Sequence, residues 1–438
     1  MKKKYIIFSI VTLVLLVSFL SYSKYLKTTN VFKEGDVKPT KITKGISMNL
    51  EQTAGAGDYK TVTQSSWPTE GYEFNAELSK CENGSTLSWD DTKKAIIVSG
   101  NLSDKCYVYF DIWIPPSIAD YCTSGTYLAT CVKNFGNQGP DISNIYIHNS
   151  TLTNGAGDNS YRYAGANPNN FVCFGSDTSP CPTDNLYRII GVFGENYHGV
   201  TGKQLVKLIK YDYMTTDELG TDGDYSLTYK EWGMDSTYKG TYGDGERIGV
   251  YYWNYKATGS KTNTWSTSLL NKTNLNTNFI NNIGTTWANK IATVTWKVGG
   301  NTYANISDVV PATTYQNEIV NPVTTNTTDN ATTYSAKIGL MYVSDYGFAA
   351  SPDAWTLTMS SYNNTTAKNN NWMYMGLYEW TISRNAGGSD GAFFVRGGGG
   401  VGLSSVGNGR GVRASFSLES SVSYVSGSGS MSDPIVIN

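Results

Sequence analysis

The residues best suited to ligand chemistry lie in a glycine-rich segment near the C-terminus. Between Arg384 and Arg413, 11 of 30 residues are glycine, and serine, asparagine, arginine and aromatic residues occupy much of the rest. Small polar residues supply adaptable hydrogen bonds in binding loops, guanidinium groups bind planar anions, and aromatic rings add flat apolar contact. We therefore predict a ligand-binding surface here. Its expected residues are Arg384, Asn385, Ser389, Asp390, Phe394, Arg396, Ser404, Asn408 and Arg410.

Catalytic patterns are weak along the chain. Residues 387–391 (GGSDG) match the G-x-S-x-G pattern, but no histidine follows Ser389, and glycines occur where a nucleophile elbow needs a helix. His148 and His198 have no cysteine or carboxylate at ligand spacing, so we expect both in solvated loops. No enzymatic activity is predicted.

An enzyme acting on polysaccharide remains an alternative. Such an enzyme needs two carboxylates in one cleft, and proximity in space is not visible in a sequence. Glu231, Glu246 and Glu379 are the candidates, because they lie beside aromatic residues.

Calcium is the one cofactor that the sequence leaves open. Asp217, Asp222 and Asp224 lie in the stretch DELGTDGDYS, where carboxylate and carbonyl oxygens of a tight turn suit Ca²⁺. Their spacing is not that of an EF-hand loop, and Asp-Gly-Asp is also ordinary turn sequence.

The 6 cysteines fall into three local pairs. Nearest-neighbour pairing is only one of many connectivities, and buried free thiols are the alternative. No CxxC spacing occurs, which weakens a structural zinc site, whereas disulfides are usual in exported proteins. The expected pairs are Cys81 with Cys106, Cys122 with Cys131, and Cys173 with Cys181.

The N-terminus predicts export. Three lysines precede the uncharged stretch Tyr5–Tyr22, whose 18 residues would span about 27 Å as a helix, close to the thickness of a bilayer core. We predict a signal anchor over residues 1–30 that holds the chain in the cell membrane with its N-terminus cytoplasmic and its bulk outside. A cleaved signal peptide, with Ser21 and Ser23 as small residues, is the alternative and would make the protein secreted.

Composition limits the partners. Charged residues are 16% of the chain and the net charge is -2, so no basic surface for nucleic acid is expected. Gly 45, Tyr 32 and abundant amide and hydroxyl residues indicate a surface that is solubilised mainly without charge.

Short strands separated by turns dominate the predicted elements. After a spacer over residues 31–65, strands over 85–89, 95–99 and 106–111 predict a small β module of residues 66–116. In the remainder, 117–438, the strands 186–193 and 205–210 alternate well enough to pair. Helices are expected over 118–133 and 264–283, an irregular excursion over 301–335, and further strands over 338–343, 372–375 and 379–383.

The C-terminal strands resemble the C-type-lectin-like domain of the formylglycine-generating-enzyme type. The matching phrases are WTIS (380–383), AFFV (392–395), GVRASFSL (411–418) and the opening strand YRIIGVF (187–193). The phrases CENGSTLSW and DKCYVYFD resemble those of many surface proteins of Gram-positive-related bacteria. The resemblance covers about residues 70–438 and implies a lectin-like domain with a long insertion. Together with the N-terminal segment, it predicts an α+β fold made of an N-terminal transmembrane helix, the β module and this lectin-like domain.

The resemblance also bears on function. Target proteins of diversity-generating retroelements share this fold and vary a C-terminal ligand-facing loop, and residues 384–411 are similar in composition to such a loop. The alternative is a flexible or tightly turning glycine-rich loop that arose without such machinery. Formylglycine-generating activity would need a late cysteine pair, but the last cysteine is Cys181. Arg413, inside the GVR phrase, is expected to form a buried structural pair.

The resulting prediction is a membrane-anchored, adhesin-like or receptor-like protein that binds a surface protein or glycan. Besides the enzyme, a purely structural envelope component is an alternative. That alternative is favoured if the glycine-rich segment packs against its own domain.

Overall fold

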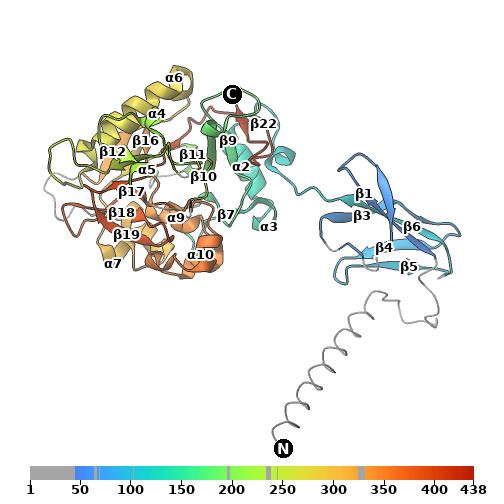
Figure 1. Cartoon of the computed structure of the whole chain (residues 1–438). Coiled ribbons are helices and arrows are strands. Elements are labelled where there is room, and N and C mark those ends of the chain that lie inside the picture. Colours follow the sequence, from blue (N-terminus) through green and yellow to red (C-terminus); the bar gives the residue numbers. More distant parts are fainter. Residues whose placement is uncertain are drawn as a thin grey trace, which may run out of the picture. The chain divides into compact units, whose positions relative to one another are not determined.

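The computed structural model describes residues 45–438, except 64–66, 69, 102, 195–197, 233–237, 244 and 324–330. The chain divides into two compact units, Met1–Pro115 and Pro116–Asn438. Strands β1 to β6 belong to the first unit, and all later elements belong to the second (Figure 1).

The first unit is built from a four-stranded sheet and a hairpin. The sheet order is β2-β1-β6-β3, with β1 parallel to β6, and β4 pairs with β5 as the sequence predicts. Met48, Leu50, Ile96, Val108 and Phe110 form the buried core. The strands are β1 (Ile46–Glu51), β2 (Tyr59–Val62), β3 (Tyr72–Cys81), β4 (Thr86–Asp90), β5 (Ala95–Ser99) and β6 (Cys106–Ile112).

Strands β1 and β2 lie where the sequence analysis placed a spacer. The local pattern of residues 46–51 does not identify the partner of β1, because that partner is β6, the last strand of the module. A strand of six residues is defined here by that distant pairing more than by its own alternation.

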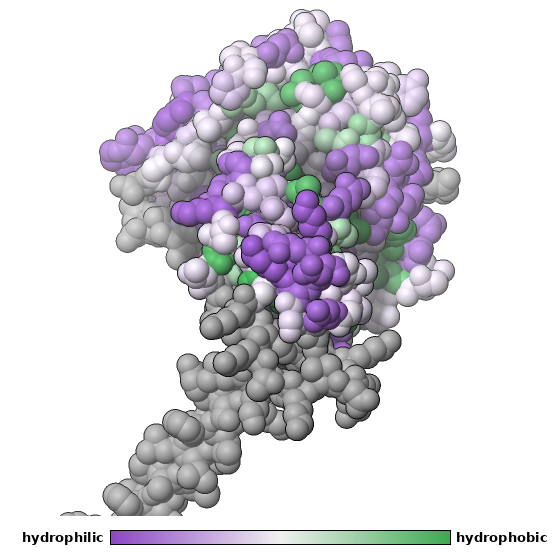
Figure 2. All heavy atoms as spheres, turned by 90° about the vertical axis from the view of Figure 1, so that its right-hand side faces the viewer, coloured by the Kyte–Doolittle hydropathy of each residue, from purple (hydrophilic) through white to green (hydrophobic). Residues whose placement is uncertain are grey.

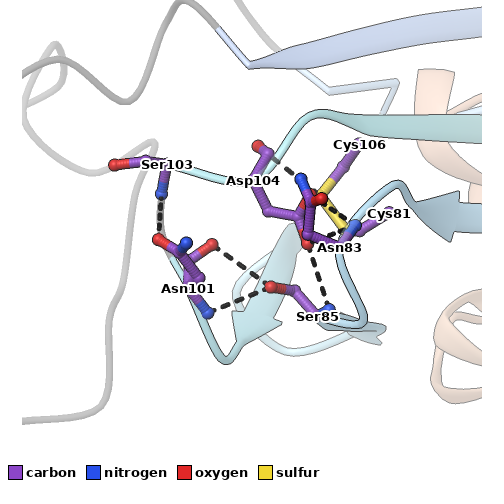
Figure 3. Close-up of a disulfide and its surroundings, with 7 residues drawn as sticks. All are labelled: Cys81, Asn83, Ser85, Asn101, Ser103, Asp104 and Cys106. Atoms are coloured by element: carbon purple, nitrogen blue, oxygen red, sulfur yellow. Dashed lines mark hydrogen bonds between the residues drawn. A yellow bond between two sulfur atoms is a disulfide. The ribbon is translucent and has the colours of Figure 1, made fainter.

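The two chain segments that connect the hairpin to the sheet are joined to each other by a disulfide and one aspartate (Figure 3). Cys81 and Cys106 are partners across β3 and β6 and form the predicted disulfide. Beside them, the buried Asp104 carboxylate accepts hydrogen bonds from the backbone N–H groups of Asn83 and Ser85, at 2.9 and 3.1 Å, and from the Asn83 amide at 3.0 Å. The segments that contain CENGS and DKC are thus joined by one covalent bond and several hydrogen bonds.

The second unit has a seven-stranded sheet at its centre. The sheet order is β16-β21-β11-β10-β8-β7, and β9 also pairs with β10. The predicted pairing of β10 with β11 is confirmed, and it is antiparallel. The strands are β7 (Ile145–Ile147), β8 (Tyr161–Tyr163), β9 (Phe171–Cys173), β10 (Leu186–Gly194), β11 (Gln204–Lys210), β16 (Ile338–Gly339) and β21 (Ser415–Ser417).

Four smaller sheets surround this sheet. One of them, β17-β18-β19, contains much of the glycine-rich segment. The strands are β12 (Tyr225–Thr228), β13 (Gly249–Tyr252) and β20 (Gly409–Arg410); β14 (Val294–Lys297) and β15 (Thr333–Ala336); β17 (Glu379–Arg384), β18 (Gly391–Val395) and β19 (Val401–Ser405); and β22 (Tyr424–Ser426) and β23 (Val436–Ile437).

The helices are short and are interleaved with the strands. The α-helices are α2 (Leu128–Gly136), α3 (Pro140–Ser143), α4 (Thr216–Leu219), α5 (Tyr229–Trp232), α6 (Ile280–Ala288), α7 (Tyr303–Ile306), α8 (Pro311–Tyr315), α9 (Val343–Phe348) and α10 (Thr365–Asn369). The 3-10 and π turns are η2 (Ile118–Tyr121), η3 (Thr183–Asn185), η5 (Trp265–Thr267), η6 (Leu270–Phe279), η7 (Gln316–Val320), η8 (Pro352–Thr356) and η9 (Met359–Ser361).

Several element predictions need correction. The helix over 264–283 is confirmed by η5, η6 and α6, but residues 303–320 form α7, α8 and η7 where an irregular excursion was expected. Their sequence has no clear apolar period, yet Ile306, Tyr315 and Ile319 are fully buried. Residues 338–343 form only a two-residue strand before α9 begins, and 372–375 form no strand.

The predicted fold class, α+β with an N-terminal transmembrane helix, also needs correction. The structure is a mixed, sheet-rich arrangement with 31% strand and 23% helix. Within residues 45–438, apart from the gaps given above, no helix is long and apolar enough to cross a membrane. The predicted anchor, Tyr5–Tyr22, lies outside the described residues.

The surface agrees with the low charge of the chain. Figure 2 shows a face that is mostly hydrophilic or intermediate in hydropathy, with hydrophobic residues in small separate groups.

The remaining two predicted disulfides, Cys122–Cys131 and Cys173–Cys181, are also present.

Asp104 offers a test of the first unit. Asp104→Ala leaves the donors of Asn83 and Ser85 without their acceptor, so the segment 81–86 should open more often. We expect its amide hydrogen exchange, measured by mass spectrometry on the full chain, to accelerate roughly 10- to 100-fold. Ser103→Ala, an exposed neighbouring change, is the control and should leave this rate unchanged. Equal rates in both variants would contradict the role given to Asp104.

Candidate functional site

The glycine-rich segment forms an ordered sheet rather than a free loop. The turn between β18 and β19 is held by two buried tyrosines, whose hydroxyls donate to backbone carbonyls: Tyr374 to Gly397 at 2.6 Å and Tyr346 to Gly399 at 2.7 Å. A Cβ atom at Gly400 would lie 2.6 Å from the Ser360 carbonyl oxygen. Glycine is needed here for close packing against the rest of the unit.

The turn between β17 and β18 is held in a similar way. Asn263 is fully buried, and its side-chain amide donates to the carbonyls of Asn385, Gly388 and Gly391, each at 2.8 Å. This turn contains the GGSDG phrase. Strand β18 follows it where a nucleophile elbow needs a helix, so the rejection of that motif is confirmed.

The nine predicted binding residues do not form one surface. Arg384, Phe394 and Arg410 are buried, Asn385 and Ser404 are half-buried, and the other four are exposed. Arg396 follows the last residue of β18, whereas the other exposed residues, Ser389, Asp390 and Asn408, lie in turns at the opposite end of that sheet.

Arg410 is enclosed by aromatic rings. Its guanidinium carbon lies 4.7 Å from the ring centre of Phe394, 5.1 Å from Tyr378 and 5.3 Å from Trp232. It also donates to the Ser404 hydroxyl at 3.0 Å. Burial lowers the pKa of Arg410 to about 10. A guanidinium held this way stabilises the fold and is not presented to a ligand.

Arg384 is likewise in the interior. Its side chain donates to the Val323 carbonyl at 3.1 Å, and burial lowers its pKa to about 10. Among the three arginines proposed from sequence, Arg396 is therefore the one whose side chain is exposed. Composition alone does not distinguish it from the other two.

Arg413 is paired as predicted. It donates to both carboxylate oxygens of Glu379, at 2.8 and 3.0 Å, and to the Met373 carbonyl at 2.7 Å. Burial raises the pKa of Glu379, although Arg413 opposes that shift. Glu379 is thus a structural partner, while Glu231 and Glu246 are exposed.

The expectation that both histidines lie in solvated loops is wrong. His148 is fully buried against Phe348, with 4.7 Å between the ring centres, and its Nδ1 accepts from the Ala156 N–H at 3.0 Å. His198 is also buried and lies 3.2 Å from the Asp158 carboxylate. The local sequences around both histidines resemble loops, but the two imidazole rings pack between aromatic residues in the interior.

His198 belongs to a buried charged network that the sequence analysis missed. Asp158 binds Arg162 at 2.7 Å, Arg162 lies 3.7 Å from Asp345, and Asp345 binds Lys207. Burial would raise the pKa of Asp158 and of Asp345, but their cationic partners hold both below the usual range. The available signal was a charge inside apolar strands, Arg162 in YRY and Lys207 in LVKLIK.

Glu318 is a further buried carboxyl beside this network. It accepts from the Ser344 N–H at 2.6 Å and from the Ser383 hydroxyl at 2.5 Å. Burial raises its pKa from 4.5 to about 7.

The predicted calcium residues are separated by the fold. Asp224 is fully buried, and its carboxylate accepts from four backbone N–H groups, those of Tyr255, Lys256, Leu269 and Leu270. Asp217 and Asp222 instead line a pocket of about 580 Å³ beside the asparagine-rich helices. In the part of the chain that the structure describes, no group of three or more His, Cys, Asp or Glu side chains is arranged to hold a metal ion.

A second pocket has the features of a ligand site. Its volume is about 350 Å³, within the range of small-molecule sites. Its floor is aromatic: Phe171 comes from β9, Trp372 and Tyr374 from the loop before β17, and Tyr211 from the end of β11. We call it the Tyr374 pocket. None of its described lining residues is Asp or Glu.

Arg188 fixes the floor of the Tyr374 pocket. Its guanidinium lies between two rings, 4.4 Å from Phe171 and 4.6 Å from Trp372, and donates to Asn170 at 2.7 Å and to the Pro168 carbonyl at 2.9 Å. Burial lowers its pKa to about 9. Because Arg188 also holds the loop 166–170, the pocket wall is fixed in advance of any ligand.

The rim of the pocket is polar. Asn167 and Asn169 are exposed, and their side-chain amides have no hydrogen-bond partner among the residues 45–438 that are described. Lys239 and Met431 complete the rim. Sequence analysis gave no signal for this site, because its residues come from six separate segments of the chain.

No protein-family model matches this chain. Neither the curated proteins nor the solved structures show a significant match to it.

Arg410 and Arg396 provide a paired test of burial. Arg410→Ala removes a cation from its aromatic enclosure and leaves a cavity, so we expect a loss of about 2–4 kcal/mol in the free energy of unfolding. Arg396→Ala changes an exposed side chain and should cost about 0.5 kcal/mol or less. Chemical denaturation of the two variants measures the difference. Similar losses would show that Arg410 is not held as described.

Glu318 predicts a pH dependence of stability. Because the pKa of Glu318 is raised in the folded protein, its protonated carboxyl stabilises the fold, and this contribution is fully present below pH 4.5. The contribution is lost as the pH rises through 7. Glu318→Gln stays neutral, so the stability of the native protein relative to the variant should fall by about 3 kcal/mol between pH 4.5 and 7.5. Denaturation at both pH values measures this, with the exposed Glu77→Gln as control. Parallel pH profiles for native protein and Glu318→Gln would refute the assignment.

Proposed function

We propose that the chain is an exported binding protein whose site is the Tyr374 pocket, and that its ligand is a surface glycan. The observation that carries this proposal is the combination of an aromatic floor with an amide rim in a pocket of about 350 Å³. The C–H face of a sugar packs on aromatic rings, while its hydroxyls exchange hydrogen bonds with amides.

The rim supplies what a sugar needs. Each of Asn167 and Asn169 carries an amide with both donor and acceptor capacity, and each is at the surface. The floor needs no rearrangement, since Arg188 is already held between its two rings. A site formed in advance loses little entropy when it binds.

Export is supported by the three disulfides. Such bonds persist in oxidising compartments and are rare in reduced ones. A glycan outside the cell would therefore be within reach of the pocket.

A purely structural envelope role is the second candidate. The glycine-rich segment packs against its own unit through Tyr346, Tyr374 and Asn263, which is the arrangement that favours this alternative. It predicts a folded protein with no saturable glycan binding, so one binding assay distinguishes the two candidates.

Filling the pocket tests the proposal. Ala166 lies exposed on the pocket wall, and Ala166→Trp would occupy the space without removing a core side chain. We expect glycans from the native cell surface, screened as an array, to bind the full chain, and Ala166→Trp to weaken that binding about tenfold or more.

The matched control is Ala119→Trp, the same change at an exposed alanine of η2. It should leave binding unchanged. Absence of glycan binding, or equal binding by the two variants, would overturn the proposal and favour the structural role.

A further inference from the structure

We infer that the Tyr374 pocket takes an anionic glycan, whose acidic group is held by Lys239 and Lys368. This rests on the proposed function and adds the chemical class of the ligand. Lys239 Nζ lies 4.5 Å from the centre of the Tyr374 ring, and Lys368 Nζ lies 6.0 Å from the same centre. Lys239 lines the pocket, and Lys368, which lies outside its lining, comes near the same Tyr374 ring from another part of the chain.

Neither ammonium group has a carboxylate partner among the residues that the structure describes. Within the described residues, no carboxylate lies within ion-pair distance of Lys239 or Lys368, and none lines the pocket. The remaining lining cation, Arg188, is buried in the floor. Burial and the neighbouring Lys368 both lower the pKa of Lys239, and a bound anion would relieve that repulsion.

Both lysines are placed by ordered backbone. The Lys239 N–H donates to the Met375 carbonyl at 2.9 Å, next to the pocket floor. The stem of Lys368 lies against Gly399, where a Cβ atom would come within 2.8 Å of the Tyr362 carbonyl oxygen. The glycine turn therefore leaves room for the Lys368 stem. The hydrogen bond from the Tyr374 hydroxyl to the Gly397 carbonyl connects this turn to the pocket.

The pocket favours a charged sugar over an acidic peptide. An extended peptide would need an exposed strand edge or a long groove for its backbone. The Tyr374 pocket instead offers a compact aromatic floor, two rim amides and one cationic edge. A sugar ring with a carboxylate or similar substituent can use all three.

The test compares two oligosaccharides that differ in charge with an acidic peptide. Short polygalacturonate oligosaccharides, their carboxyl-reduced neutral counterparts and a polyglutamate peptide are titrated against the full chain by calorimetry. We expect the acidic oligosaccharide to bind at least tenfold more tightly than the neutral one, with an affinity that falls as salt rises. Lys239→Ala and Lys368→Ala should each weaken it about five- to tenfold, whereas the corresponding arginine variants should keep most of it.

Lys272→Ala, an exposed lysine on η6, is the control and should bind as the native protein does. Equal binding of acidic and neutral oligosaccharides, blocked by Ala166→Trp but not by the lysine variants, would overturn this inference and leave the proposed function intact. Polyglutamate binding as tight as that of the oligosaccharide would overturn the glycan assignment. Binding of neither oligosaccharide would overturn both proposals.

Discussion

The buried carboxylate of Asp345 is the interaction on which the second unit depends. It lies between Lys207 of β11 and Arg162 of β8, and it accepts from the Tyr342 N–H at the start of α9. Removing one member of such a network leaves uncompensated charge in the core, which costs more than an exposed pair could contribute. Helix α9 then extends the connection, because Glu318 joins its first turn to Ser383 of β17. The glycine-rich sheet is attached to the central sheet through this chain of polar contacts.

Local patterns predicted the elements whose partners are close in sequence. The hairpin β4–β5, the pair β10–β11 and the strands β17 and β18 all show alternation or apolar runs that the structure confirms. Prediction failed where distant residues decide the outcome. Residues 303–320 show no clear apolar period, yet they form α7, α8 and η7 and bury Ile306 and Ile319 in the core. Arg410 was expected at the surface, but Trp232 and Tyr378 enclose it.

The same reasoning explains why the candidate site in the structure, the Tyr374 pocket, differs from the surface predicted from the sequence. Arginine, glycine and aromatic residues in one segment suggest a binding loop, yet the sequence does not say which side chains reach solvent. The Tyr374 pocket is assembled by Arg188, which stacks between residues of β9 and of the loop before β17. Tyr374, through its bond to Gly397, links that pocket to the segment identified first. A pocket formed from six segments leaves no periodic signal in any of them.

The tethered turns limit how this protein can change over evolutionary time. Tyr346, Tyr374 and Asn263 bind backbone carbonyls, so the path of the glycine-rich chain is fixed by atoms that every residue type shares. Glycines at close approaches, such as Gly400, cannot drift to larger residues. Substitutions among relatives should therefore concentrate at the few outward side chains, Ser389, Asp390, Arg396 and Asn408, while the course of the backbone stays the same.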